Sequence, residues 1–251
     1  MYDFDDALFA DMTSTRRLLG QERKCEKSAS AADVVIAGND YLAEWAEQFS
    51  ANVVMIPSCV EPSDYKAKDS WTIEGPPTLV WLGSPSTEQF IAGIADALWT
   101  VHAATGARLL LISGQLENPE LGALEHMIDR VPWTPSVFAP ALHRADVAVG
   151  PLSDTAFTRG KCAYKLLQYA ASALPMVASP VGANALALQR FDGIAAASPS
   201  EWVEALIGII EDEPARRRER GKAALNAVAQ HYSFSVWSTL WRSATGVGTS
   251  S

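Results

Sequence analysis

The chain has 251 residues, 48% of them hydrophobic, which is enough to bury a sizeable core in one or two domains. A net charge of −9 and a pI near 4.9 exclude nucleic acid as a general partner, because phosphate backbones require a basic surface. Residues 1–58 form the first predicted unit, with strands over 34–37 and 53–56 and a helix over 41–49. Two strands are too few for a stable sheet.

Residues 59–77 are rich in Pro, Ser, Asp, Lys and Glu and lack periodicity, so we interpret them as an interdomain linker. A nearly complete doubly wound unit follows over residues 78–230, because apolar runs alternate with amphipathic stretches. Its predicted strands cover 78–82, 109–113, 127–131, 147–150 and 176–179, and its predicted helices cover 87–101, 160–173, 201–210 and 216–231. The last unit, residues 231–251, contains a helix over 233–244 whose apolar face is expected to pack against the domains: Phe234, Trp237, Leu240 and Trp241.

Cysteine usage and hydropathy indicate the compartment. The three cysteines, Cys25, Cys59 and Cys162, have neither disulfide nor zinc spacing, and a reducing environment suits them. The sequence has no apolar run of spanning length, and acids stand where a signal peptide carries bases, so we expect a soluble, cytoplasmic protein. The basic run at 216–220 predicts a solvated helix face, with peripheral contact to an anionic membrane as the minority alternative.

The stretch from Arg159 to Asn184 predicts a site for a phosphate-bearing ligand. Lys161 and Lys165 stand four residues apart and share one face near the start of the predicted helix. Helix N-termini favour anions and lysines add positive charge, so a diphosphate would be held there. A strand and a glycine turn follow, and the next helix is expected to begin near Gly182. The N-terminus of that helix would face the same crevice. The alternative is that the two lysines belong to a solvated helix face.

Several segments along the chain carry a family resemblance in their order. They are YDFDDALF at 2–9, ADVVIAGNDYLAEWA at 32–46, VVMIPSCVEPSDY at 53–65, VWLGSPSTEQF at 80–90, ADVAVGPLSD at 145–154, and the stretch 159–184. Together they resemble the group 1 glycosyltransferases. This resemblance implies an α/β fold of GT-B type, with a complete Rossmann-like C-terminal domain and the remnant of a Rossmann-like N-terminal, acceptor-side domain.

The resemblance also implies the chemistry. Members of this family transfer a sugar from a nucleotide diphosphate sugar to an acceptor, here a saccharide, a lipid or another compound, with retention of anomeric configuration. No obligatory metal or cofactor is implied beyond the nucleotide sugar, which serves as donor substrate. A place in cell-envelope or polysaccharide biosynthesis follows from the same likeness. A non-catalytic nucleotide-sugar-binding module stays open as the alternative.

By the same resemblance, Lys161 and Lys165 would offset the charge on the leaving diphosphate and so carry the catalytic weight. Trp133 would lie in the base pocket, although a packed surface aromatic is an equal alternative. The remaining donor contacts are expected from turn and helix residues: Gly83, Ser84, Ser86, Thr87, Arg159, Gln168, Gly182 and Asn184. No catalytic role is expected for the histidines at scattered polar positions: His102, His126, His143 and His231.

Two positions depart from the family pattern. Many members have two glutamates separated by seven residues, and alignment places Gly160 and Gln168 at these positions. Gln168 can still hydrogen-bond the ribose hydroxyls, but Gly160 has no side chain with which to contact the donor sugar. The phosphate cradle is therefore expected to be intact and the sugar contacts altered.

The resemblance places YDFDDALF inside an N-terminal domain, after several strands. On the order of a hundred residues of acceptor-side domain are then expected to be absent. We interpret the chain as a truncated gene product, a product of a wrongly assigned start, or half of a split enzyme. The strands over 34–36 and 53–56 would expose apolar edges that attract a partner chain.

Asp3, Asp5 and Asp6 also resemble the first motif of haloacid dehalogenase-type phosphatases, in which clustered carboxylates act beside magnesium. This remote alternative requires a strand before Asp3 and a later acidic pair for the metal. Before Asp3 the sequence offers only Tyr2 as a strand residue. For the later acidic pair it offers only Asp192, which precedes a glycine, and this single aspartate does not make the motif.

Overall fold

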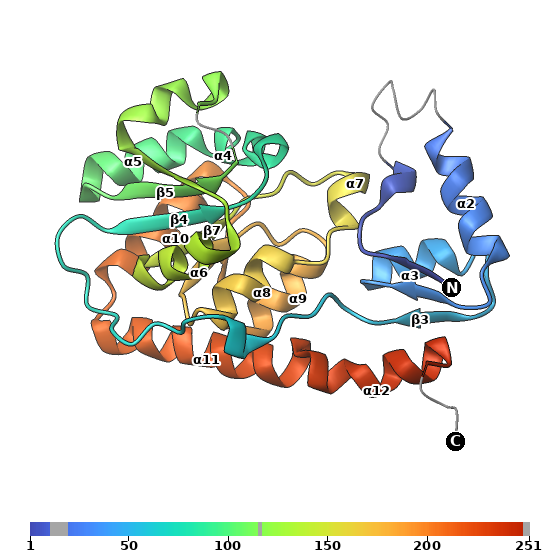
Figure 1. Ribbon diagram of the computed structural model, residues 1–251. Coiled ribbons are helices and arrows are strands. Elements are labelled where there is room, and N and C mark those ends of the chain that lie inside the picture. Colours follow the sequence, from blue (N-terminus) through green and yellow to red (C-terminus); the bar gives the residue numbers. More distant parts are fainter. Residues whose placement is uncertain (11–19, 115–116, 248–251) are drawn as a thin grey trace.

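The computed structural model describes residues 1–10, 20–114 and 117–247. Its strands form two parallel sheets that lie beside each other (Figure 1). The small sheet contains, in spatial order, β1 (Tyr2–Phe4), β2 (Val35–Ala37) and β3 (Val53–Met55). The large sheet has the spatial order β6 (Ile128–Pro132), β5 (Arg108–Ser113), β4 (Thr78–Leu82), β7 (Val147–Gly150), β8 (Met176–Ala178) and β9 (Ile194–Ala195).

Helices cover both faces of the large sheet. One face packs against α4 (Gln89–Ala92), α5 (Ala95–Thr105), η4 (Pro119–Met127) and α10 (Pro199–Glu211). The other packs against α6 (Pro135–Arg144), α8 (Tyr164–Ala171), α9 (Ala183–Arg190) and α11 (Pro214–Tyr232). Residues of β4 alternate between the two cores, with Leu79 and Trp81 on the first side and Val80 and Leu82 on the second. Burial on both faces explains the continuous apolar strands in the sequence.

The small sheet is covered on one face by η1 (Leu8–Ala10), α2 (Gln21–Ala31) and α3 (Asp40–Ala46). An aromatic layer lies there, in which the parallel rings of Phe9 and Trp45 have centroids 4.1 Å apart. The C-terminal helix α12 (Phe234–Thr245) runs past the small sheet (Figure 1). Its tryptophans are half-buried, whereas Phe234 and Leu240 are exposed, so the expected packing of the whole aromatic face was wrong for these two.

Residues 59–77 connect the two sheets without regular structure except for η2 (Pro62–Asp64). This segment nevertheless makes specific contacts with the rest of the chain. The indole Nε1 of buried Trp71 donates to the carbonyl of Ala173 at 3.1 Å, and Nε of Arg217 donates to the Trp71 carbonyl at 2.9 Å. The connection is therefore attached to the helices that cover the large sheet.

Most strand predictions agree with the structure to within one residue, but one helix prediction was wrong where it matters. The helix expected over 160–173 begins only at Tyr164, after a separate α7 (Ala156–Arg159). Ala163 has a left-handed backbone, with φ of 57°, which interrupts the helix. The helix expected over 87–101 is likewise broken into η3 (Pro85–Thr87), α4 and α5.

Strand β1 and helix α2 were not predicted from the sequence, and their weak burial explains why. Strand β1 is only three residues long and contains a charged one, and α2 is polar along its length, with only Cys25 and Ala29 buried. Among the described helices, none combines the length and apolarity that crossing a membrane requires.

Candidate functional site

A cavity of about 830 Å³ opens at the carboxyl ends of β4 and β7. The strand order of the large sheet reverses between these two strands, and ligands of open parallel sheets bind at such a reversal. Gly83 and Ser84 follow β4 in the cavity wall, while Pro151 and Leu152 follow β7. Asp5 and Asp6, which follow β1, and Ser58 and Cys59, which follow β3, also line the cavity, so it lies between the two sheets.

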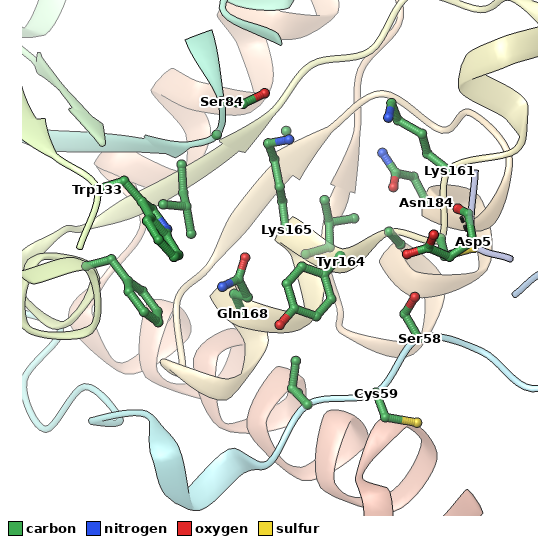
Figure 2. A pocket seen from close by; sticks show the side chains of 18 of the residues that line it. Asp5, Ser58, Cys59, Ser84, Trp133, Lys161, Tyr164, Lys165, Gln168 and Asn184 are labelled. Atoms are coloured by element: carbon green, nitrogen blue, oxygen red, sulfur yellow. Dashed lines mark hydrogen bonds between the residues drawn. The ribbon is translucent and has the colours of Figure 1, made fainter. Parts of the chain in front are cut away.

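The structure brings together most of the residues expected at the donor. Figure 2 shows Trp133 on one side of the cavity, Lys161, Asn184 and Asp5 on the other, and Lys165 between them. The expected residues that line the cavity are Gly83, Ser84, Trp133, Lys161, Lys165, Gln168 and Asn184. Those outside its lining are Ser86, Thr87, Arg159 and Gly182.

Lys165 lies in the first turn of α8 and extends into the cavity (Figure 2). Desolvation, followed by repulsion from Lys161, lowers the pKa of its ammonium group to about 8. Its Nζ lies 5.5 Å from the ring centroid of Trp81. No ion pair engages Lys165 in the part of the chain that the structure describes. A poorly solvated cation without a paired carboxylate favours an incoming anion.

Lys161 has a different environment, because it precedes α8 instead of sharing a helix face with Lys165. The expectation of one common helical face was wrong for this reason. Its Nζ forms an ion pair with Oδ1 of Asp6 at 3.1 Å and lies 4.8 Å from the ring centroid of Phe157. Lys161 therefore links the large sheet to the small one, a contact for which the sequence gives no signal.

Hydrogen bonds from the Tyr169 and Thr87 side chains hold β4 and the turn that follows it in place. The buried hydroxyl of Tyr169 accepts from the Leu82 amide at 3.0 Å and donates to the Val149 carbonyl at 3.3 Å, which ties β4 to β7. Thr87 Oγ1 donates to the Ser84 carbonyl at 2.9 Å. Thr87 and its neighbour Ser86 thus shape the turn that presents Gly83 and Ser84 to the cavity.

Arg159 and Gly182 meet behind the cavity. Gly182 has a φ of 55°, and a Cβ atom there would lie 2.4 Å from the Arg159 carbonyl oxygen. The Arg159 side chain points elsewhere, because its Nε pairs with Oδ1 of Asp154 at 2.6 Å. Close backbone packing accounts for this glycine in physical terms.

The far end of the cavity is aromatic. Trp133 is half-exposed and its ring plane is within 5° of that of Phe138, with centroids 5.9 Å apart. Tyr65, from the connection between the sheets, meets Phe138 edge to face. Burial raises the pKa of Tyr65 to about 12, and a hydrogen bond with Gln168 opposes that shift. The sequence did not predict Tyr65 as a site residue, because a region without periodicity gives no indication of where its side chains lie.

The small sheet holds the loop that carries Lys161. Nδ2 of Asn39 donates to the Lys161 carbonyl at 3.2 Å, while its Oδ1 accepts from the Leu42 amide and caps α3. Cys162 Sγ donates to the Asp5 carbonyl at 3.2 Å. Burial raises the pKa of the Cys162 thiol to about 12, which makes it an inert packing group.

Family comparison agrees with this geometry, since the model for glycosyl transferases group 1 matches residues 76–212, more than half of the chain. The chain belongs to the group 1 glycosyltransferases. No curated protein sequence matches it. Within the described ranges, no group of three or more His, Cys, Asp or Glu residues could hold a metal ion.

Solved structures confirm the expected GT-B type fold for this family member. Sucrose-phosphate synthase from Thermosynechococcus elongatus matches with a TM-score of 0.72 and 17% identity, over 95% of this chain and 64% of that one. Anabaena HepE in complex with UDP and glucose gives 0.73 and 13%, over 98% and 71%. WaaG, a glycosyltransferase involved in lipopolysaccharide biosynthesis, gives 0.70 and 14%, over 95% and 69%. The chain spans 64% of the synthase and 50% of Staphylococcus aureus TarM.

Gly160 stands where many family members have a glutamate. A Cβ atom there would lie 2.3 Å from Cβ of Ala7 and 2.7 Å from its backbone nitrogen. The close approach of Ala7, in the segment between β1 and η1, therefore excludes a side chain at this position. Gly160 does not line the cavity, whereas Gln168, at the second glutamate position, does.

Proposed function

We propose that the chain binds a nucleotide diphosphate sugar in the 830 Å³ cavity and transfers the sugar, with retention of anomeric configuration, to an acceptor on the side of the small sheet. Lys165 is the observation that carries this proposal. It is a desolvated cation without an ion-pair partner among the described residues, at the point where the strand order reverses. The likeness to HepE in complex with UDP and glucose supports a nucleotide sugar as the ligand.

A diphosphate beside Lys165 would replace the missing counter-charge. During transfer, the bond from the anomeric carbon to the diphosphate oxygen breaks, and negative charge develops on the leaving diphosphate. Lys165 would stabilise that charge, with Lys161 adding a second cation when the diphosphate competes with Asp6. The rest of the rate enhancement would come from holding donor and acceptor in contact. The reaction requires no metal in this proposal.

The other lining residues have places in the same arrangement. We assign Trp133 to the base, Gln168 to the ribose, and Ser84 with Asn184 to the diphosphate. All four side chains line the cavity and surround Lys165 (Figure 2). We assign the domain division as 1–58, 59–77, 78–230 and 231–251. The donor residues then belong to the third unit, and the acceptor side to the first.

Calorimetric titration tests the donor site. We expect UDP, GDP or ADP to bind, and Lys165→Ala to weaken that binding by about 30-fold or more, as the loss of a charge-assisted contact implies. Lys222→Ala is the matched control, because Lys222 is exposed on α11. EDTA should leave the affinity unchanged. Equal affinities of the Lys165 variant and the wild type would remove this lysine from the site.

A second candidate, a nucleotide-sugar-binding module without transfer, is favoured by Gly160, which cannot contact the donor sugar. Incubation with UDP-, GDP- and ADP-sugars separates the two. Release of free nucleotide when acceptors are added supports transfer, and tight binding without release supports the module.

A partner chain that completes the small sheet is part of the same proposal. In the described part of the chain, β1 pairs with β2 on one side, and its other edge has no strand beside it. Such an edge is a template for strand addition. We place the reaction in the cytoplasm, in the synthesis of a polysaccharide or an envelope component.

A further inference from the structure

A second cavity, of about 690 Å³, lies between α12 and the small sheet. It has no part in donor binding as proposed above. Both cavities share Asp5, Ser58, Cys59 and Phe234 in their walls, so the two cavities are adjacent. A molecule in the second cavity would therefore face the donor across these residues.

One wall of the second cavity consists of indole rings. Nε1 of Trp237 donates to the His231 carbonyl at 2.8 Å, and the Trp241 side chain hydrogen-bonds Asp3. These contacts fix both rings and use their N–H groups. The rings, which are half-buried, offer a ligand their apolar faces rather than hydrogen bonds.

The other wall is acidic. Asp3 and Asp5 line the cavity, and Arg242 is the one cation among its described lining residues. Burial raises the pKa of Asp3, repulsion from Asp5 adds to the shift, and the bond with Trp241 opposes it. Carboxylates accept hydrogen bonds from hydroxyl groups and repel phosphates. The second cavity has no lysine among its described lining residues, whereas Lys161 and Lys165 line the donor cavity together with the carboxylates of Asp5, Asp6, Glu61 and Asp64.

We propose that this second cavity binds a neutral sugar unit of the acceptor. The inference rests on the proposed function, since it names the class of acceptor that such a transferase would use. A sugar ring has C–H faces that pack on indole and hydroxyl groups that donate to Asp3 and Asp5. A lipid chain would bury both carboxylates without donors, which costs free energy, and a phosphorylated acceptor would be repelled.

Fluorine NMR of protein labelled with 5-fluorotryptophan tests this assignment. Each of the eight tryptophans gives one resonance, assigned through single Trp→Phe variants. We titrate with the methyl glycosides of glucose, galactose, mannose and N-acetylglucosamine up to about 50 mM, since single sugars bind weakly. At least one glycoside should shift the Trp237 and Trp241 resonances. Trp99, exposed on α5 and outside the described lining of both cavities, is the internal control.

The role of the Asp3 carboxylate can be tested with a single variant. Asp3→Asn keeps the shape of the wall and removes one carboxylate, so the effective glycoside should bind about fivefold more weakly. Glucose 6-phosphate should shift Trp237 and Trp241 less than methyl glucoside does. If no glycoside moves these resonances, if hexanol moves them instead, or if Asp3→Asn binds as tightly as the wild type, the inference is wrong.

The same sample separates this inference from the donor proposal. UDP, GDP and ADP should shift Trp133, which lines the donor cavity, and Trp81, next to Lys165. A nucleotide response at Trp133 without any glycoside response defeats the acceptor site alone. A glycoside response at Trp237 and Trp241 without any nucleotide response defeats the proposed donor site, and with it the description of the sugar as an acceptor.

Discussion

The two sheets of this chain differ in how they are supported. The large sheet has helices on both faces, and its strands β7 and β8 are buried at every position. In the small sheet only the central strand β2 is wholly buried among the described strands, while β1 and β3 are partly exposed. The large sheet can therefore form its side of the 830 Å³ cavity by itself. The small sheet depends on contacts with the loop before α8 and with helix α12.

The contacts between the sheets rely on close packing at two glycines, where neighbouring atoms leave no room for a side chain. A Cβ atom on Gly38 would lie 2.4 Å from Sγ of Cys162, and Gly160 meets Ala7 in a similar way. Asn39 and the Asp6–Lys161 ion pair add polar contacts. Substitutions at this junction should separate the sheets while the large core stays intact.

Gly160→Glu, which restores the residue common in the family, should have the largest effect. Its side chain would overlap Ala7, and overpacking against backbone costs about 3 kcal/mol or more. We expect hydrogen exchange to accelerate in residues 34–46, with strands β4 and β5 still protected. Gly122→Ala is the control, since no atom lies within 4 Å of the position of its Cβ. Unchanged protection in residues 34–46 would contradict the junction described here.

Lys165→Met should raise stability at neutral pH while it weakens nucleotide binding. The pKa of Lys165 is lowered from 10.5 to about 8 in the folded chain, which corresponds to about 3 kcal/mol of destabilisation while the group is charged. The unfolded chain binds more protons between these two pH values, so wild-type stability rises as pH increases from 8 to 10.5. Urea unfolding at several pH values measures this.

The gain from Lys165→Met should be greatest below pH 8 and vanish above pH 10.5, where lysine is neutral in both states. Lys222→Met, on an exposed face of α11, should show no such pH dependence. A stability difference that does not vary with pH would mean that desolvation of Lys165 is not its cause.

The sequence predicted the large sheet better than the small one, because the strands of the large sheet are more deeply buried. Strands such as β7 and β8 are apolar at every position because they are buried on both faces, so their limits are clear from the sequence. Strand β1 is short and partly exposed, and α2 buries only Cys25 and Ala29. Weakly buried elements leave weak patterns.

For the site, the sequence placed Lys161, Lys165, Trp133, Gln168 and Asn184, all of which line one cavity. It could not show that Lys161 is paired with Asp6, because that contact joins residues 155 positions apart. It also could not show that Gly160 faces Ala7 and does not line the cavity. Local spacing predicts helices and turns, whereas the junction between the sheets depends on tertiary packing.

Asn39→Ala should destabilise the chain by about 2 kcal/mol, because Asn39 both caps α3 and donates to the loop before α8. Asn39→Ser separates the two roles, since serine also caps helices but is too short to reach the loop. We expect about half of the loss for serine. Urea unfolding gives both values, and equal losses for Ala and Ser would assign the whole effect to the contact between the sheets.

Asp6→Asn should change stability least and affect binding in the opposite direction. The Asp6–Lys161 ion pair is partly exposed, with side chains 39% and 22% accessible, and such pairs contribute about 0.2–1 kcal/mol. Removing the carboxylate frees Lys161 for the diphosphate, so UDP affinity should rise about twofold to fivefold at low salt, and the gain should shrink in high salt. Calorimetry at two salt concentrations measures this. Weaker binding after Asp6→Asn would mean that Asp6 positions Lys161 for the diphosphate rather than competing with it, and that the small sheet takes a direct part in holding the donor.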